Sequence, residues 1–202
     1  MSPMPLRERN RQRVRQRIIA AAADLFGSDG YAQTTMDDIA QKAEVSRATL
    51  FNYFPTKDAL LIPFAVEIFQ SQIQPRLTAY LSSKPDTFDA FRFLFTDIHH
   101  YVFAVRDIDR AFKRAFLEPK ALERSDHIYE AGFTDSLIEI LRYGQRRGEV
   151  RTDLTLEKQA GYIGALYISI FYSMVMNIDV VEHASEVETL LRFLESGLRP
   201  PT

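Results

Sequence analysis

Apolar residues recur along this chain with the three- and four-residue spacing of amphipathic helices, and the alternating runs typical of strands are rare. The first such stripe belongs to a helix that ends near Gly30, where glycine suits a left-handed cap. Its apolar positions are Val14, Ile18, Ala22, Leu25 and Phe26. The pattern predicts an all-α protein without internal repeats.

Two short helices follow, and each begins at a hydroxyl residue that can cap it. Thr35 opens the second helix, with Asp38 three residues later as the acidic member of a capping box. Ser46 opens a third helix over Arg47–Phe54, which Pro55 stops. Two short helices joined by a tight turn are the arrangement that places a helix in the major groove of DNA.

Beyond residue 56 the pattern predicts longer helices at about 57–82, 86–105, 107–118, 120–147, 154–178 and 183–198. Pro63 falls inside the first of them and cannot donate to the carbonyl of Ala59. We therefore expect a kink there. No flexible linker precedes this helix, so it both separates and connects two parts of the chain.

A helical projection of the third helix, at about 100° per residue, separates an inward from an outward face. Leu50 and Phe54 lie inward, and the outward and flanking positions are Arg47, Ala48, Thr49, Phe51, Asn52 and Tyr53. Asparagine can pair bidentately with adenine, arginine with guanine, and a methyl group can contact thymine. Lys57, at the start of the next helix, suits a phosphate.

The net charge of −2 is unusual for a nucleic-acid-binding protein, but the charge is unevenly distributed. Residues 1–17 hold six arginines against one glutamate, whereas residues 61–202 hold 16 basic and 20 acidic side chains. The arginines alternate and therefore spread around a helix axis. They are either a solvated tail or an arm that contacts phosphates or the minor groove.

Residues 31–40 (YAQTTMDDIA) and 45–60 (VSRATLFNYFPTKDAL) resemble the DNA-binding domain of the tetracycline-repressor (TetR) family. The resemblance covers about residues 12–61. It implies a homodimer on a palindromic operator, released when a ligand binds the C-terminal domain. Position by position, it implies a DNA-facing set of Thr35, Ser46, Arg47, Ala48, Thr49, Phe51, Asn52, Tyr53 and Lys57.

The sequence departs from the family pattern at two positions. Glu44 stands where the turn often has glycine, so we expect a non-glycine residue with positive φ. Phe51 stands where many relatives carry tyrosine, which removes a hydroxyl group that can bond phosphate. These differences concern affinity and operator preference more than architecture.

Residues 61–202 contain 12 Phe and 7 Tyr, and one stripe combines Phe88, Phe91, Phe95, His99 and Val102. Such a stripe is either ordinary core or the wall of an apolar pocket. We expect a hydrophobic effector, such as an aromatic or acyl compound, near Phe95, His99, Phe103, Phe116, Tyr129, Phe133 and Tyr172. His99 and His100 point about 100° apart, so we expect no shared metal, and no cofactor.

Residues 159–178 carry no charge over a length that could cross a bilayer. Polar side chains are spread throughout this segment, however, and its flanks lack a one-sided excess of Lys and Arg. We expect it to be buried at a subunit interface, with burial inside one subunit as the alternative. The expected dimer residues are Gly161, Gly164, Ala165, Ile168, Phe171, Leu190 and Phe193.

Together these observations predict a helix-turn-helix domain with a basic arm at residues 1–57, and a helical effector-binding and dimerisation domain at residues 58–202. We expect a ligand-responsive repressor, cytoplasmic and nucleoid-associated when bound to DNA. The alternatives are an enzyme and an architectural DNA-binding protein without an effector. The absence of a phosphate-binding loop, a zinc-protease motif and a nucleophile elbow argues against the enzyme.

Overall fold

The computed structural model describes residues 5–116, 132–176 and 183–200, and every regular element in these ranges is helical. The all-α prediction is confirmed. The N-terminal unit (residues 6–57) contains α1 (Leu6–Asp29), α2 (Met36–Lys42) and α3 (Arg47–Tyr53). The C-terminal bundle (residues 58–200) contains η1 (Asp58–Leu60), α4 (Leu61–Ile68), η2 (Phe69–Ile73), α5 (Gln74–Ser82), α6 (Thr87–Phe103), α7 (Ile108–Phe116), α9 (Thr134–Arg146), α10 (Leu156–Met176) and α11 (His183–Leu198).

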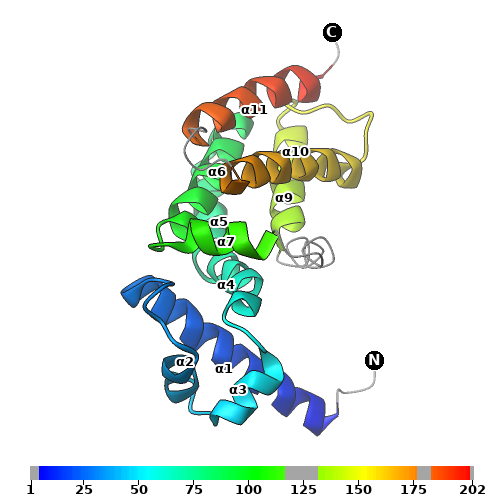
Figure 1. Cartoon of the computed structure of the whole chain (residues 1–202). Helices are drawn as coiled ribbons and strands as arrows, with labels where there is room; N and C mark the ends of the chain where they lie inside the picture. The colour runs from blue at the N-terminus through cyan, green and yellow to red at the C-terminus, as the bar shows by residue number, and fades with distance from the viewer. Residues whose placement is uncertain (1–4, 117–131, 177–182, 201–202) are drawn as a thin grey trace.

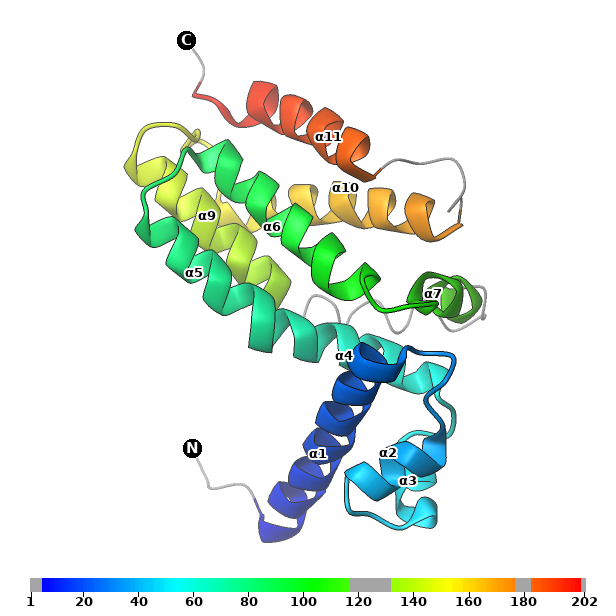
Figure 2. The ribbon, with the colours of Figure 1, turned by 90° about the vertical axis from the view of Figure 1, so that its left-hand side faces the viewer.

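The two units lie one above the other, and α1 rises to meet α4 where the chain passes between them (Figures 1 and 2). Ile18, Ile39 and Leu50, one from each helix of the N-terminal unit, are fully buried. Helix α1 begins at Leu6, earlier than the apolar stripe indicated. The arginines from Arg7 onward therefore lie on a helix and not on an extended tail.

The long helix predicted at 57–82 is interrupted, but not at the expected residue. Pro63 is the third residue of α4, and the first turn of a helix lacks intrahelical partners for its N–H groups. The expected kink at Pro63 is therefore wrong. The irregularity is the π turn η2, which ends two residues before Pro75. A proline at that position cannot donate to the carbonyl of Ser71, and the wider turn accommodates this loss.

In the C-terminal bundle, α10 packs against α9, and α11 packs against α6. The apolar stripe predicted on α6 is largely internal, because Phe88, Phe91, Phe95 and Val102 are at most 5% exposed. Asp86 caps α6 by accepting a hydrogen bond from the N–H of Phe88 at 2.8 Å. The core of this unit is therefore built mainly around aromatic side chains from α6.

We predict that Gly144→Ala lowers the free energy of unfolding by about 1–3 kcal/mol, because α9 has no room for a methyl group at this position. An added Cβ would lie 2.6 Å from Cγ2 of Val150 and 2.8 Å from the side chain of Thr87. Urea denaturation with an unchanged m value measures this difference.

Gly27→Ala is the matched control, because nothing lies within 4 Å of an added Cβ there. In this exposed position of α1 the substitution should raise stability by about 0.5–1 kcal/mol. Equal effects of the two substitutions would contradict the packing argument.

Candidate DNA-reading surface

Both short helices are capped as the sequence predicts. Oγ1 of Thr35 accepts from the N–H of Asp38 at 3.2 Å, and the N–H of Thr35 donates to Oδ2 of Asp38 at 2.9 Å. The hydrogen bonds from Thr35 lower the pKa of the Asp38 carboxyl group. Oγ of Ser46 accepts from the N–H of Thr49 at 3.1 Å, and the two hydroxyl groups lie 2.8 Å apart. The starts of α2 and α3 are thus fixed by their own side chains.

Helix α3 turns the predicted face outward. Leu50 and Phe54 are buried, at 0% and 4% exposure. Arg47, Ala48, Phe51 and Asn52 are exposed, and Thr49 and Tyr53 are partly buried. The inward and outward faces agree with the projection, because the spacing of two apolar residues on a short helix determines both.

Arg47 has partners at this surface. Nη1 of Arg47 lies 2.9 Å from Oδ2 of Asp37 on α2, and its guanidinium group lies 5.5 Å from the centre of the Phe51 ring. The three side chains are exposed, so the pair is readily exchanged for other partners. The arrangement holds Arg47 at the outer edge of α3 before any ligand is bound.

The turn between α2 and α3 has the expected strain. Glu44 has a φ of 52°, which confirms the prediction of a left-handed, non-glycine residue. Nη2 of Arg17, on α1, donates to the carbonyls of Ala43 and Glu44 at 2.8 and 3.0 Å. This arginine therefore stabilises the turn, and Arg15 lies 5.5 Å from the centre of the Phe54 ring. Part of the basic N-terminal segment thus contacts the N-terminal unit itself.

The sequence predicts that Lys57 contacts a DNA phosphate, but its side chain is directed to the loop between α1 and α2. Its Nζ donates to the carbonyls of Tyr31 and Thr34, both at 2.7 Å, and lies 4.4 Å from the centre of the Tyr31 ring. These contacts hold the loop between α1 and α2. The structure therefore gives Lys57 a supporting position behind the reading surface. The sequence could not show this, because Lys57 is distant along the chain from Tyr31 and Thr34.

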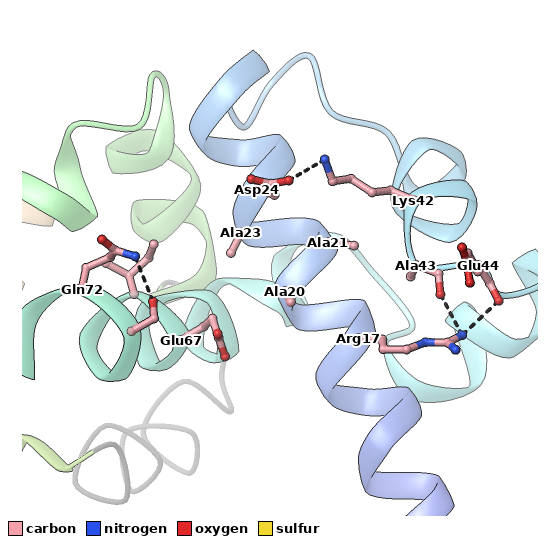
Figure 3. A pocket seen from close by; sticks show the side chains of 12 residues that line it. Arg17, Ala20, Ala21, Ala23, Asp24, Lys42, Ala43, Glu44, Glu67 and Gln72 are labelled. Carbon is pink, nitrogen blue, oxygen red and sulfur yellow. Dashed lines mark hydrogen bonds and ion pairs between the residues drawn. The ribbon is translucent and has the colours of Figure 1, made fainter. Parts of the chain in front are cut away.

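A groove of about 560 Å³ separates α1 from the π turn. Figure 3 shows α1 with Ala20 and Ala23 on one side and Glu67 and Gln72 on the other. An ion pair between Lys42 and Asp24 lies at its edge. The small alanine side chains leave this space open, and a hydrogen bond from Gln16 of α1 to Glu67 of α4 joins the two units beside it.

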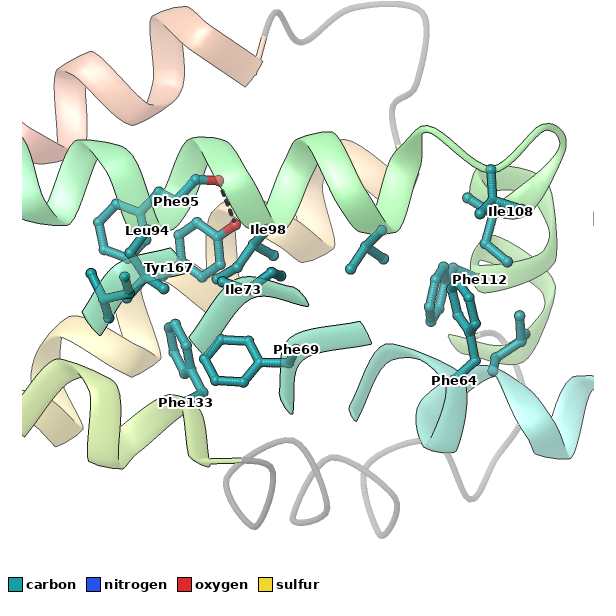
Figure 4. Packing of buried hydrophobic residues seen from close by; sticks show 14 of the residues in the cluster. Phe64, Phe69, Ile73, Leu94, Phe95, Ile98, Ile108, Phe112, Phe133 and Tyr167 are labelled. Atoms are coloured by element: carbon teal, nitrogen blue, oxygen red, sulfur yellow. Dashed lines mark hydrogen bonds between the residues drawn. The ribbon is translucent and has the colours of Figure 1, made fainter. Parts of the chain in front are cut away.

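Among the predicted effector residues, Phe95 and Phe133 lie together in the core (Figure 4). Tyr167 stacks on Phe95 with ring centroids 4.4 Å apart and lies 5.6 Å from Phe133. The ring of Phe69, from the π turn, meets that of Phe133 edge to face, with ring centroids 6.1 Å apart. Burial raises the pKa of Tyr167, whose hydroxyl group donates to the carbonyl of Phe95 at 3.4 Å. Phe69 and Tyr167 were not predicted as members of this cluster.

His99 and Tyr172 are less buried than the members of that cluster. His99 is partly buried, and burial lowers the pKa of its imidazole. Tyr172 is 47% exposed. Phe103 and Phe116 lie in α6 and α7, with side chains outside the described residues, and Tyr129 also lies outside them.

The predicted dimer residues divide by burial. Exposed members are Gly161, Ala165 and Phe193, partly buried members are Ile168 and Phe171, and buried members are Gly164 and Leu190. The structure adds two exposed hydrophobic side chains on α10 that were not predicted. Tyr162 is 64% exposed and Leu166 is 38% exposed. We call the outer surface of α10 and α11 around Tyr162, Leu166 and Phe193 the α10–α11 face.

Residues 18–62 match the family described as bacterial regulatory proteins, tetR family. The N-terminal unit therefore carries the DNA-binding domain of the TetR family. Its N-terminal part is 37% identical over 57 residues to the regulator TcmR of Streptomyces glaucescens, covering 28% of this chain and 25% of TcmR. It is also 38% identical over 58 residues to RutR of Escherichia coli K12, and this alignment covers 29% of this chain and 27% of RutR. The alignments thus span about a quarter of these relatives.

Solved structures match both units of the chain. FadR of Thermus thermophilus, a TetR-family repressor solved with lauroyl-CoA, has a TM-score of 0.69 and 28% identity over 91% of this chain and 94% of FadR. FadR of Bacillus subtilis, solved with stearoyl-CoA, has a TM-score of 0.62 and 22% identity. This match covers 90% of this chain and 98% of that FadR. The all-helical architecture of both units is therefore shared with these solved structures.

The match of residues 18–62 to a family of regulatory proteins agrees with the expectation of a regulator and not an enzyme. In the described parts of the chain, no helix combines the length and apolarity required to cross a membrane.

Proposed function

We propose that this chain is a transcriptional repressor that binds a palindromic operator as a homodimer and is released by a small hydrophobic ligand. One observation carries the proposal: a capped helix, α3, presents an exposed amide and guanidinium while its apolar face is buried. A rigid helix with hydrogen-bonding groups outward is what the major groove accepts. The proposal includes the division of the chain into a DNA-binding domain at residues 1–57 and an effector-binding and dimerisation domain at residues 58–202.

Within the proposed reading surface, Asn52 and Arg47 read base edges, and Ala48 and Thr49 contact methyl groups or phosphates. Thr35 and Ser46 bring the N-termini of α2 and α3 to the DNA backbone, where free N–H groups bind phosphate. Lys57 acts indirectly, because its ammonium group holds the α1–α2 loop.

We predict that Asn52→Ala weakens binding to a DNA sequence selected from a random pool by about 5- to 100-fold at fixed salt, as expected for loss of one good base contact. Selection with the wild-type protein should return a palindromic sequence, and selection with the variant should relax it at one symmetric position. Ser82→Ala, which changes an exposed polar residue of α5, is the control. An unchanged consensus in Asn52→Ala would refute direct readout by this residue.

The α10–α11 face is the proposed dimer interface. Its exposed aromatic and aliphatic side chains form an apolar surface on two adjacent helices, and a second copy would cover it in a two-fold four-helix arrangement. Gly161 and Ala165 keep the α10 side of this face flat, which permits close approach of helices.

We predict that the double variant Leu166→Glu with Phe193→Glu is a folded monomer in light scattering, because dimerisation would bury two unpaired carboxylates. Leu6→Glu is the matched control, since Leu6 is 65% exposed on α1, far from this face. A variant that stays dimeric at the concentration where wild type is dimeric would place the interface elsewhere.

The proposed effector carries an acyl chain. Thermus thermophilus FadR was solved with lauroyl-CoA, and in this chain the corresponding unit has an aromatic core next to the π turn. An apolar chain gains free energy when it enters such a core, at about 0.8 kcal/mol per buried CH₂ group. Displacement of the π turn would then change the position of α4.

We predict that lauroyl-CoA releases the selected DNA from the wild-type protein, whereas coenzyme A without the acyl chain does not. Fluorescence anisotropy of labelled DNA measures the release. Tight DNA binding that neither compound nor a broad set of apolar compounds affects would favour the alternative, an architectural protein without an effector.

A further inference from the structure

The N-terminal unit contacts the C-terminal bundle at a second place, in addition to α4. The turn between α6 and α7 lies against the end of α1. The N–H of Tyr31 donates to the carbonyl of Arg106 at 3.1 Å, and Nη2 of Arg106 donates to the carbonyl of Asp29 at 2.7 Å. We infer that this turn is a second, noncovalent attachment of the N-terminal unit and that Arg106 is its positioning residue.

Residues on both sides of this contact, Gly30 and Asp107, have backbone conformations with positive φ. Gly30 has a φ of 89°, and a Cβ there would lie 3.1 Å from Nε of Arg106. Glycine is therefore required both by the backbone conformation and by the close approach of the arginine. On the other side, Asp107 has a φ of 65°, a left-handed conformation that is uncommon outside glycine. The turn adopts this conformation directly after Arg106.

The attached loop leads to the proposed reading surface. Tyr31 is buried, its hydroxyl group hydrogen-bonds Asp58, and Lys57 holds its carbonyl. Four residues later Thr35 caps α2, which packs on α3. A shift at Tyr31 therefore moves the start of α2 and, through it, the orientation of α3.

Helix α7 connects the same turn to the C-terminal bundle. Ile108 and Phe112 are buried, and Figure 4 shows them beside Phe64 of α4. The ring of Phe112 also lies 5.9 Å from that of Phe171 in α10. A displacement of α10 or α7 therefore reaches Arg106 without passing along α4 from the π turn.

This inference rests on the proposed function, because it assigns a regulatory role to a contact behind the reading surface. With α4 alone, the N-terminal unit could rotate about one connection. Two attachments fix its orientation, and a dimer needs that orientation to place two α3 helices on one face of a duplex. Loss of the α6–α7 contact is then a route by which an effector releases DNA.

The test compares Arg106→Ala with Arg110→Ala. Both arginines are exposed and lie four residues apart, but among the described residues the ion pair of Arg110 is with Asp107 alone, at 3.9 Å. We expect Arg106→Ala to weaken binding to the selected DNA by about 2- to 10-fold, the range for loss of one hydrogen bond, without added effector. We also expect faster hydrogen exchange at the amide of Tyr31 in the free protein, at an unchanged melting temperature. Arg106→Lys should restore part of the DNA affinity and part of the protection of the Tyr31 amide from exchange, since an ammonium group can donate to the Asp29 carbonyl.

Identical behaviour of the two alanine variants would overturn the inference. So would faster exchange with unchanged DNA affinity, because the contact would then exist without positioning the N-terminal unit. If the wild-type protein selects no DNA, the proposed function fails, and exchange at Tyr31 still decides whether the attachment exists: faster exchange only in Arg106→Ala supports it, and unchanged exchange overturns it.

Discussion

The N-terminal unit and the C-terminal bundle are joined by a buried aromatic contact. Phe26, near the end of α1, lies between Tyr31 and Phe64 of α4, with ring centroids 5.0 and 5.5 Å away. All three side chains are nearly or fully buried, and burial of one such ring contributes about 1.5–3 kcal/mol. This contact lies at one end of α1, and farther along the same helix Ala20 and Ala23 border the groove near the π turn while Gln16 hydrogen-bonds Glu67 of α4. The other contacts between the units are arranged around this joint.

Features that depend on neighbouring residues could be predicted from the sequence. The caps at Thr35 and Ser46, the faces of α3 and the left-handed Glu44 all follow from spacings of four residues or fewer and from local backbone chemistry. The order of the helices in the C-terminal bundle was also predictable, because apolar periodicity persists over long stretches. The boundaries of α6 and α11 differ from the expected ones by at most two residues.

Features that depend on packing between distant segments could not be predicted. The sequence shows Lys57 as an exposed-looking cation after a proline, and only the folded chain brings it to the carbonyls of Tyr31 and Thr34. Pro63 was a reasonable candidate for a kink, but the helix begins just before it. Pro75 lies near the real irregularity, and its effect depends on the π turn that the bundle core supports.

The position of the π turn explains how a compact core could affect a distant surface. Its buried residues, Phe69 and Ile73, belong to the aromatic core, whereas Ser71 and Gln72 line the groove beside α1. The same five-residue turn therefore contacts both the proposed effector region and the open side of the joint. A π turn has weaker constraints than a regular helix, since one residue more than usual occupies the turn. Displacement of Phe69 would thus change the course of α4 more readily than bending of a continuous α-helix, and the buried ring of Phe64 would carry that change to α1.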